Sequence, residues 1–367
     1  MLQQLLKERD LLPILTMNDG SPVTPETWQQ RRTEMREALE TYSYGRTPPP
    51  PKRVWVEEIP EPTTFTHIYA GKVRQQRLLL SFETEQGICS FPFVLARSLN
   101  IEKPPVFLHL CNASPLPNKF APVEEITDAG FALAVVYYQD IINDNHHGDF
   151  SNGIAAHFGT TINRTPEEWG KIGMWAYGAS RILDYLLTRE DIDAAHTAVI
   201  GHSRLGKAAL WAAAQDERFF AAISNDSGYG GAASSKHASG ERIRDFFRLG
   251  SWDLFCENFK TFVDQEDNKP YDQAWLLALI APRLLYVGSA EGDPAADPPT
   301  EFLTSLWASQ AWEFLGKPGL ITPDRMPAAG ETLHEGCVGY HMRKGLHFLS
   351  REDWNYYFRF LHKHLDD

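Results

Sequence analysis

The stretch VIGHSRLGKAA, residues 199–209, decides the fold of this 367-residue chain. An apolar strand runs directly into Ser203, and an alanine-rich helix follows at once. Serine favours neither the interior of a helix nor that of a strand, so its place at the junction indicates that the turn itself matters. A side chain on a sharp turn after a central parallel strand stands above the carboxyl edge of the sheet, where ligands bind in open α/β folds.

The sequence on both sides of this junction alternates between apolar runs and helical segments. We expect buried strands at residues 105–110, 131–138, 197–202, 219–224 and 283–289. We expect helices at residues 165–189, 204–215 and 351–364, the first with Thr165 and Glu168 as a capping box and the last with Ser350 and Asp353. Alternating strands and helices predict a mostly parallel sheet covered on both faces.

The amino-terminal region has a different texture. Residues 24–44 have the helical spacing of an amphipathic helix, and GRTPPPPKR at residues 45–53 predicts an extended connector because proline has no backbone N–H to donate. Runs rich in β-formers follow at residues 53–59, 64–70, 77–84 and 90–96, which indicate an antiparallel entry to the sheet.

Composition excludes several classes of partner. The chain is 43% hydrophobic, which is enough for a sizeable core. Its formal net charge of −13 argues against nucleic acid or an anionic membrane surface as the main partner. The four cysteines are far apart and are interpreted as reduced thiols. The first residues mix charges with apolar side chains, so they lack the uninterrupted apolar centre of a secretion signal. No apolar run reaches the roughly 18 residues of a membrane span. If Met1 is the native start, we expect a cytoplasmic protein.

Ser203 is our candidate nucleophile. The amino end of the following helix points its N–H groups toward the same place and favours negative charge that develops during a reaction. The local pattern is G-x-S-x-x-G, since Leu205 separates Arg204 from Gly206. The alternative is that this serine merely caps the helix.

A nucleophilic serine needs an orienting acid and a base, which in such folds follow it along the chain in that order. The acid normally follows the next-to-last strand, where RLLYVGSAEGDPAADPP at residues 283–299 offers Glu291, Asp293 and Asp297. Asp293 is the best placed. The base normally sits in the loop before the last helix, which predicts His347.

Other histidines compete for the role of base. His202 is adjacent to the serine and should project away from it, whereas spacing alone leaves His334 and His341 open. The segment NDNHHGD at residues 143–149 could suggest a metal site. Adjacent histidines project in different directions, however, and no second ligand cluster accompanies them, so we expect no metal and no other cofactor.

Several segments together carry a family resemblance. GHSRLGKAALWAAAQDERFFAAISNDSGYGG, residues 201–231, resembles the nucleophile region of the glucuronoyl esterases, whose pattern is G-C/H-S-R-x-G-K. Segments at residues 169–186, 256–260, 270–283 and 289–303 resemble bacterial members in the same order. The resemblance implies an α/β-hydrolase three-layer sandwich with a mostly parallel central sheet and an N-terminal helix/β extension. We divide the chain into a helix and proline-rich connector at 1–52, packed on an α/β-hydrolase domain at 53–367.

The resemblance also implies roles for individual residues. Ser203 matches the nucleophile, His347 the base, Arg204 the residue that stabilises the oxyanion, and Lys207 the lysine that contacts sugar hydroxyls. The acid varies in position within the family. It corresponds here either to Asp293 or to Asp226, which has a shorter side chain than the glutamate of relatives that use that place. Reach therefore favours Asp293.

The implied activity is hydrolysis of a small carbohydrate ester, most directly a 4-O-methyl-glucuronoyl ester of xylan. The sequence departs from the family where members carry a tryptophan in the acid loop, near Ala295, and where Leu254 replaces the tryptophan of W-F-C. Aromatic platforms bind sugar rings, so these changes affect the sugar contact. The alternatives are an intracellular acetyl esterase acting on oligosaccharides and a non-catalytic sugar-binding relative.

Overall fold

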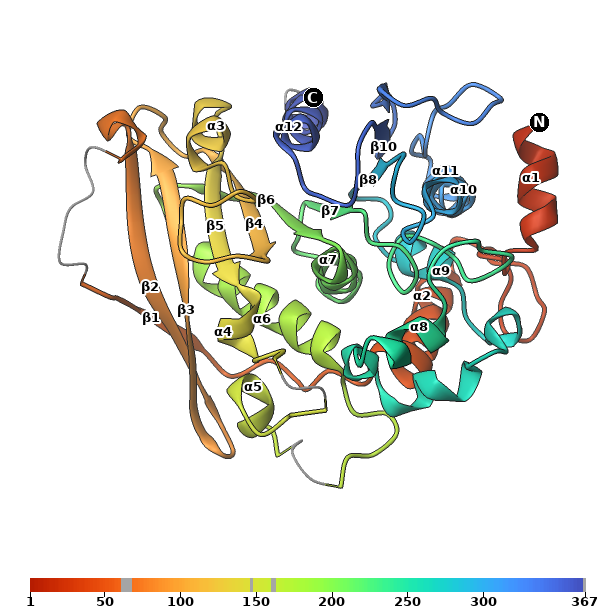
Figure 1. Cartoon of the computed structure of the whole chain (residues 1–367), viewed down its shortest axis with the longest axis horizontal. Coiled ribbons are helices and arrows are strands. Elements are labelled where there is room, and N and C mark those ends of the chain that lie inside the picture. The colour runs from red at the N-terminus through yellow and green to blue at the C-terminus, as the bar shows by residue number, and fades with distance from the viewer. Residues whose placement is uncertain (61–67, 146–147, 160–162, 366–367) are drawn as a thin grey trace.

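The computed structural model describes residues 1–60, 68–145, 148–159 and 163–365 (Figure 1). The histidine pair at residues 146–147, considered above as a metal site, lies outside the described residues, as does most of the predicted strand at residues 64–70. The described end of that strand is different from the prediction: Ile68–Gly71 forms a short 3-10 turn.

In the described part of the chain, ten strands form one mixed sheet in the order β1-β2-β3-β5-β4-β6-β7-β8-β10-β9. The run from β5 to β10 is parallel, whereas β1, β2 and β3 enter it antiparallel, as the sequence predicts. The strands are β1 Val54–Glu58, β2 Val73–Thr84, β3 Gly87–Ser98, β4 Pro105–Cys111, β5 Ala132–Tyr137, β6 Asp193–His202, β7 Ala221–Asn225, β8 Leu284–Ala290, β9 Glu331–Leu333 and β10 Val338–Arg343.

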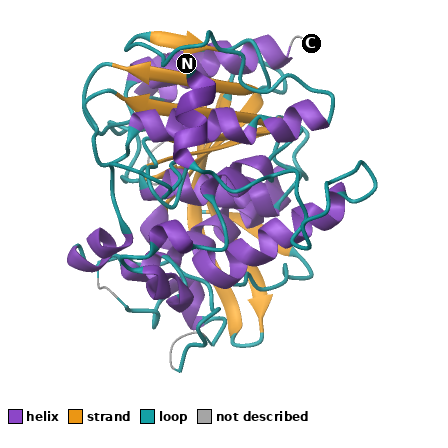
Figure 2. Cartoon of the chain, turned by 90° about the vertical axis from the view of Figure 1, so that its right-hand side faces the viewer, coloured by secondary structure: helices purple, strands orange, loops and turns teal. Residues whose placement is uncertain are grey.

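Helices cover both faces of this sheet, which makes the three layers of an α/β-hydrolase (Figures 1 and 2). On β4, Leu108 faces the core under α6 and α7, and its neighbour Phe107 faces the core under α3 and α12, because successive strand residues point to opposite faces. The helices are α1 Leu2–Arg9, α2 Trp28–Leu39, α3 Val123–Asp128, α4 Tyr138–Ile141, α5 Gly153–Ala156, α6 Lys171–Leu186, α7 Arg204–Gln215, α8 Ile243–Arg248, α9 Gln273–Ala278, α10 Pro298–Ala308, α11 Gln310–Phe314 and α12 Arg351–Leu365. Among the described residues, each helix is too short or too polar to cross a bilayer.

The amino-terminal helices pack on the main body rather than standing apart from it. The ring of Trp28 on α2 lies 5.6 Å from that of Phe314, and the Arg31 guanidinium stacks 4.3 Å from the centre of the Trp275 ring. After α2, a π-helical turn at Glu40–Tyr44 leads into the proline connector. The division of the chain at residue 52 stays a prediction.

The predicted helix at 165–189 begins later than expected, at Lys171, with Gly170 rather than Thr165 before its first turn. The intervening residues pair with the chain near Tyr44 instead: the Arg46 N–H donates to the Glu167 carbonyl and the Gly170 N–H to the Tyr44 carbonyl. Tertiary pairing thus overrides a local capping pattern. The capping box of α12 is confirmed, since Ser350 and Asp353 exchange backbone-to-side-chain hydrogen bonds.

Candidate active site

Ser203 occupies a strained turn between β6 and α7. Its backbone has φ 59° and ψ −128°, in the left-handed region that a serine rarely adopts. The turn is tight because a Cβ on Gly201 would lie 2.0 Å from the Leu205 carbonyl oxygen, so only glycine fits there. The Ser203 hydroxyl makes no capping bond to α7. Its hydroxyl is therefore held out at the sheet edge rather than used to stabilise the helix.

The residues expected from the sequence line one cavity of about 270 Å³ at this edge. They come from the turn between β6 and α7 (the elbow) and the first residues of α7, from the loops that follow β7 and β8, and from the loop before α12. They are Ser203, Arg204, Lys207, Asp226, Asp293 and His347. Parallel strands that end at the same edge account for this convergence of residues far apart in sequence.

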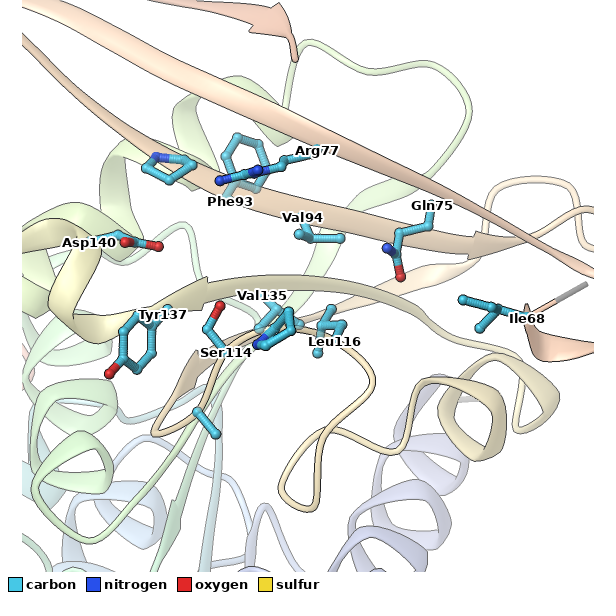
Figure 3. Close-up of a pocket in the computed structure, with 13 residues that line it drawn as sticks. Ile68, Gln75, Arg77, Phe93, Val94, Ser114, Leu116, Val135, Tyr137 and Asp140 are labelled. Carbon is cyan, nitrogen blue, oxygen red and sulfur yellow. The ribbon is translucent and has the colours of Figure 1, made fainter. Parts of the chain in front are cut away.

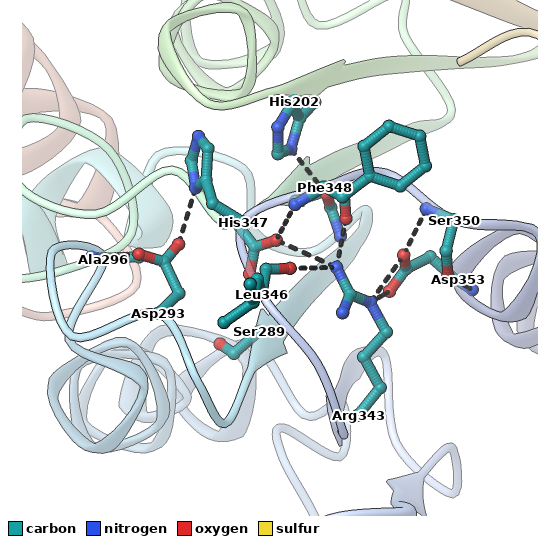
Figure 4. Close-up of polar contacts among 12 residues, drawn as sticks. His202, Ser289, Asp293, Ala296, Arg343, Leu346, His347, Phe348, Ser350 and Asp353 are labelled. Carbon is teal, nitrogen blue, oxygen red and sulfur yellow. Dashed lines mark hydrogen bonds and ion pairs between the residues drawn. The ribbon is translucent and has the colours of Figure 1, made fainter. Parts of the chain in front are cut away.

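His347 and Asp293 form the central hydrogen bond of the cavity, with 2.6 Å between His347 Nδ1 and Asp293 Oδ2 (Figure 4). Burial opposes ionisation of Asp293, but the hydrogen bond and the charge of His347 outweigh it, so the pKa of this carboxyl is lowered overall. Because Nδ1 is used by Asp293, Nε2 is the nitrogen left for a substrate or nucleophile. The ring also packs against His202, with 4.4 Å between centroids.

Asp226 lies in the same cavity but makes different contacts. Its Oδ2 accepts hydrogen bonds from Arg343 Nη2 at 3.3 Å and from the Phe348 N–H at 3.4 Å. Burial, together with the neighbouring charge of Glu301, raises the pKa of Asp226 to about 9, so this carboxyl is neutral at pH 7. No hydrogen bond joins it to His347 among the described residues, and the two candidate acids are therefore not equivalent.

The competing histidines serve other contacts. His202 Nδ1 lies 2.7 Å from Asn225 Oδ1, and burial lowers the pKa of this ring to about 4. His334 bonds the Tyr286 hydroxyl, and His341 bonds Asp353 at 2.8 Å. Within the described part of the chain, none of these three lines the cavity.

Two cationic side chains, those of Arg204 and Lys207, line the cavity with Ser203. Arg204 Nη1 lies 2.5 Å from Asp144 Oδ2, and buried Lys171 bridges Asp144 at 3.1 Å to Asp253 at 2.7 Å, so the guanidinium is held by a buried charge network. Sequence reasoning did not single out these network residues, because nothing near Arg204 in the chain signals them.

Lys207 is almost fully buried, and its ammonium donates to the Ser227 carbonyl at 2.6 Å and lies 3.7 Å from Glu241. Burial lowers the pKa of Lys207. The loop that faces it is fixed by Glu301, which accepts from the Ser227 and Gly228 N–H groups at 3.0 and 2.9 Å. Glu301 is a further residue that the sequence patterns did not reveal.

Ligand-type atoms of Asp226, Asp293 and His347 lie within 4.8 Å of one another, a spacing that could hold a metal ion. The hydrogen bond between His347 and Asp293, and the guanidinium on Asp226, account for this grouping without one. The expectation that no metal is needed stays a prediction.

Near the acid loop the cavity wall is formed by Ala295 and Ala296, and among the described residues no aromatic side chain takes that place. Trp252 does not line the cavity; its ring instead lies 3.6 Å from the Lys260 ammonium. Phe246, Leu249 and Leu254 supply apolar contact in the same cavity.

A second cavity of about 350 Å³ shares no lining residue with the first. It lies between β2, β3 and β5 and the loop after β4, with Arg77, Asp140 and Tyr137 among its polar groups (Figure 3). Ser203, His347 and Asp293 thus line only the first of these two cavities.

Comparisons with known proteins show which family this chain resembles. A family model described as fungal glucuronyl esterase matches residues 121–316. A carbohydrate esterase from an unknown prokaryotic organism is 40% identical over 246 residues, covering 66% of this chain and 56% of that protein. A 4-O-methyl-glucuronoyl methylesterase from Podospora anserina is 27% identical over 284 residues, covering 74% of this chain and 53% of that protein. The chain thus spans little more than half the length of these curated relatives.

Solved structures match over nearly the whole chain. A glucuronoyl esterase from Solibacter usitatus is 33% identical with a TM-score of 0.83, covering 95% of this chain and 96% of that one. One from Teredinibacter turnerae is 25% identical with a TM-score of 0.85, covering 98% and 90%.

Proposed function

Because the chain belongs to the glucuronoyl esterase family, we propose that it is a serine-dependent carboxylic ester hydrolase acting on carbohydrate esters. The observation that carries the proposal is the hydrogen bond between His347 and Asp293 in the cavity lined by Ser203. A base held by a buried carboxylate beside a serine on a strained elbow is the constellation that acyl transfer requires.

The proposed mechanism is a two-step acyl transfer. The Ser203 Oγ bonds to the ester carbonyl carbon while His347 Nε2 takes the hydroxyl proton. Asp293 stabilises the imidazolium that forms. The Arg204 N–H at the start of α7 and the Arg204 guanidinium hold the oxyanion. The ester C–O bond then breaks, and His347 gives its proton to the leaving alcohol. Water repeats the sequence on the acyl-enzyme, and no cofactor takes part.

Asp293 acts as the orienting acid in this scheme. It is ionised because His347 lowers its pKa, whereas Asp226, with a pKa raised to about 9, carries no charge with which to stabilise an imidazolium. The hydrogen bond to His347 Nδ1 also fixes the ring so that Nε2 faces the cavity.

We propose a 4-O-methyl-glucuronoyl ester as the substrate class. Arg204 and Lys207 place positive charge and hydrogen-bond donors around the serine, which suits a polar sugar acid better than a long acyl chain. Relatives in the comparisons are named 4-O-methyl-glucuronoyl methylesterases. Because Ala295 and Ala296 offer no aromatic face, we expect weaker sugar binding than a tryptophan at that wall would give.

The test is a comparison of kcat/KM for benzyl glucuronate, an acetylated xylo-oligosaccharide and a long-chain nitrophenyl ester, with Ser203→Ala as the blank. We expect measurable cleavage of the glucuronate ester and poor cleavage of the long-chain ester. Turnover of the acetylated sugar alone would favour the acetyl esterase alternative. Sugar binding without turnover of any ester would favour the non-catalytic alternative.

A further inference from the structure

His347 sits in a segment without helix or strand, at residues 344–350 between β10 and α12. Its side chain is 45% exposed, so packing alone does not fix it. A base must keep its distance to a nucleophile within a fraction of an ångström, because a misplacement of about 1 Å can cost a hundredfold in rate. Some other contact must therefore hold this segment.

The guanidinium of Arg343, the last residue of β10, lies inside the segment (Figure 4). Its Nη2 donates to the carbonyl oxygen of Leu346 at 3.0 Å and to that of Phe348, the residues on either side of His347. Its Nη1 donates to the Lys344 carbonyl at 3.1 Å. One side chain thus satisfies three carbonyls that bracket the base.

The guanidinium is itself anchored from two directions. Arg343 Nε donates to both carboxylate oxygens of Asp353, at 2.9 and 2.8 Å, and Asp353 lies in the first turn of α12. Asp226, just after β7, accepts from Nη2 and from the Phe348 N–H. Arg343 is 3% exposed, and the two carboxyl groups are buried, so water does not compete for these bonds.

We infer that Arg343, with Asp226 as its second anchor, is a positioning residue that sets the place of His347 relative to Asp293 and Ser203. The inference rests on the proposed role of His347 as the base. A planar guanidinium presents five N–H donors in a fixed fork, and this site uses them on carbonyls and carboxylates at once. Lysine, with one rotatable ammonium, can hold Asp353 or the carbonyls but not both.

This inference gives Asp226 a role distinct from that of the orienting acid. Its contacts go to the backbone of the His347 segment and to the guanidinium, and none goes to the imidazole among the described residues. Asp226 then acts on the base through the main chain, whereas Asp293 acts on the ring.

The experiment compares Arg343→Lys with the wild type, using benzyl glucuronate for kinetics. It also follows the downfield proton resonance of the hydrogen bond between His347 and Asp293, which requires no substrate. We expect kcat to fall about a hundredfold with KM changed less than about threefold, because the lining around Lys207 and Arg204 is untouched. The downfield resonance should broaden or disappear. Arg351→Lys is the matched control, an exposed arginine whose side chain contacts Glu125 and the Lys119 carbonyl instead.

A folded Arg343→Lys enzyme with near wild-type kcat and an unchanged resonance would overturn the inference. If that variant does not fold, Asp226→Ala carries the test, because it removes one anchor and the acceptor of the Phe348 N–H while leaving Asp353 in place. We expect about a tenfold loss of kcat and a broadened resonance; wild-type values of both would overturn the inference. If the wild type cleaves no ester, the proposed function fails, but the resonance still reports whether Arg343 positions the ring.

Discussion

Asp293 and Asp226 are the same residue type at the ends of neighbouring strands, and both line the cavity of Ser203. Both are buried, at 4% and 1% exposure. They differ in what reaches them: the imidazole of His347 bonds Asp293, whereas a guanidinium and a backbone N–H bond Asp226. The pKa of the first is lowered and that of the second is raised. Position at the sheet edge therefore makes both residues candidates for the orienting acid, and the hydrogen-bond partner of each carboxyl distinguishes their roles.

The largest expected effect is the loss of kcat when the nucleophile is removed, and it is the reference against which the two carboxyl variants are compared. Ser203→Ala should lower kcat by about a millionfold, as on removal of a nucleophile that acts as a unit with its base. The measurement is hydrolysis of benzyl glucuronate by a protein whose circular dichroism matches the wild type. Retention of most activity would remove the nucleophile assignment and with it any catalytic meaning of the difference between Asp293 and Asp226.

The comparison itself is tested by two isosteric changes. Asp293→Asn should lower kcat by about ten thousandfold, because the amide cannot stabilise the imidazolium or hold the required tautomer. Asp226→Asn should cost tenfold or less, since an amide oxygen can still accept from the Phe348 N–H. A larger loss for the second variant would reverse the assignment and make Asp226 the orienting acid.

The sequence predicted the elbow and the parallel sheet because their signals are local: the glycines, the serine and the hydrophobic period lie within a few residues of one another. Helix α7 has the expected bounds, Arg204–Gln215. The preference for Asp293 over Asp226 also rests on a local argument, the reach of a short side chain. It stays a prediction, and the hydrogen bond between Asp293 and His347 is the observation that supports it.

The supporting contacts could not be predicted in this way. Arg343 and Asp226 are 117 positions apart, and Arg204 and Asp144 are 60 apart, so no spacing rule links them. Charged residues of this kind are usually expected on the surface, and only the folded chain shows that Arg343, Asp226 and Asp144 are buried and that all four residues are paired. The late start of α6 has the same cause, a tertiary partner that local patterns do not reveal.

Lys207 can be compared with the two carboxyls because it lines the same cavity without touching His347. Lys207→Met should raise KM for benzyl glucuronate about tenfold with a smaller change in kcat, consistent with loss of a charged hydrogen-bond donor to the sugar. KM for a nitrophenyl acetate should change little. Lys317→Met, at an exposed lysine outside the cavity, is the control. A fall in kcat alone would place Lys207 with the carboxyls that govern His347.

The last comparison concerns stability, where the two carboxyls should make the free energy of unfolding depend on pH in opposite ways. Asp226 has a folded pKa of about 9, above its unfolded value of about 3.9, so the folded state keeps a proton that the unfolded chain has released. Its contribution is present below pH 4 and is lost as the pH rises toward 9, with a slope of at most ~1.4 kcal/mol per pH unit. Asp226→Asn should therefore gain stability relative to the wild type as the pH rises from 5 to 9.

Asp293 has a lowered pKa, so its contribution is present above its unfolded pKa and is lost only as the pH falls through its folded value. Asp293→Asn should then trail the wild type by a constant margin from pH 5 to 9, and that margin should narrow below about pH 4. Urea unfolding of both variants at pH 4, 5, 7 and 9 measures the two slopes side by side. Parallel curves would show that the two carboxyls ionise alike in the folded protein, and the distinction drawn from their bonding partners would fail.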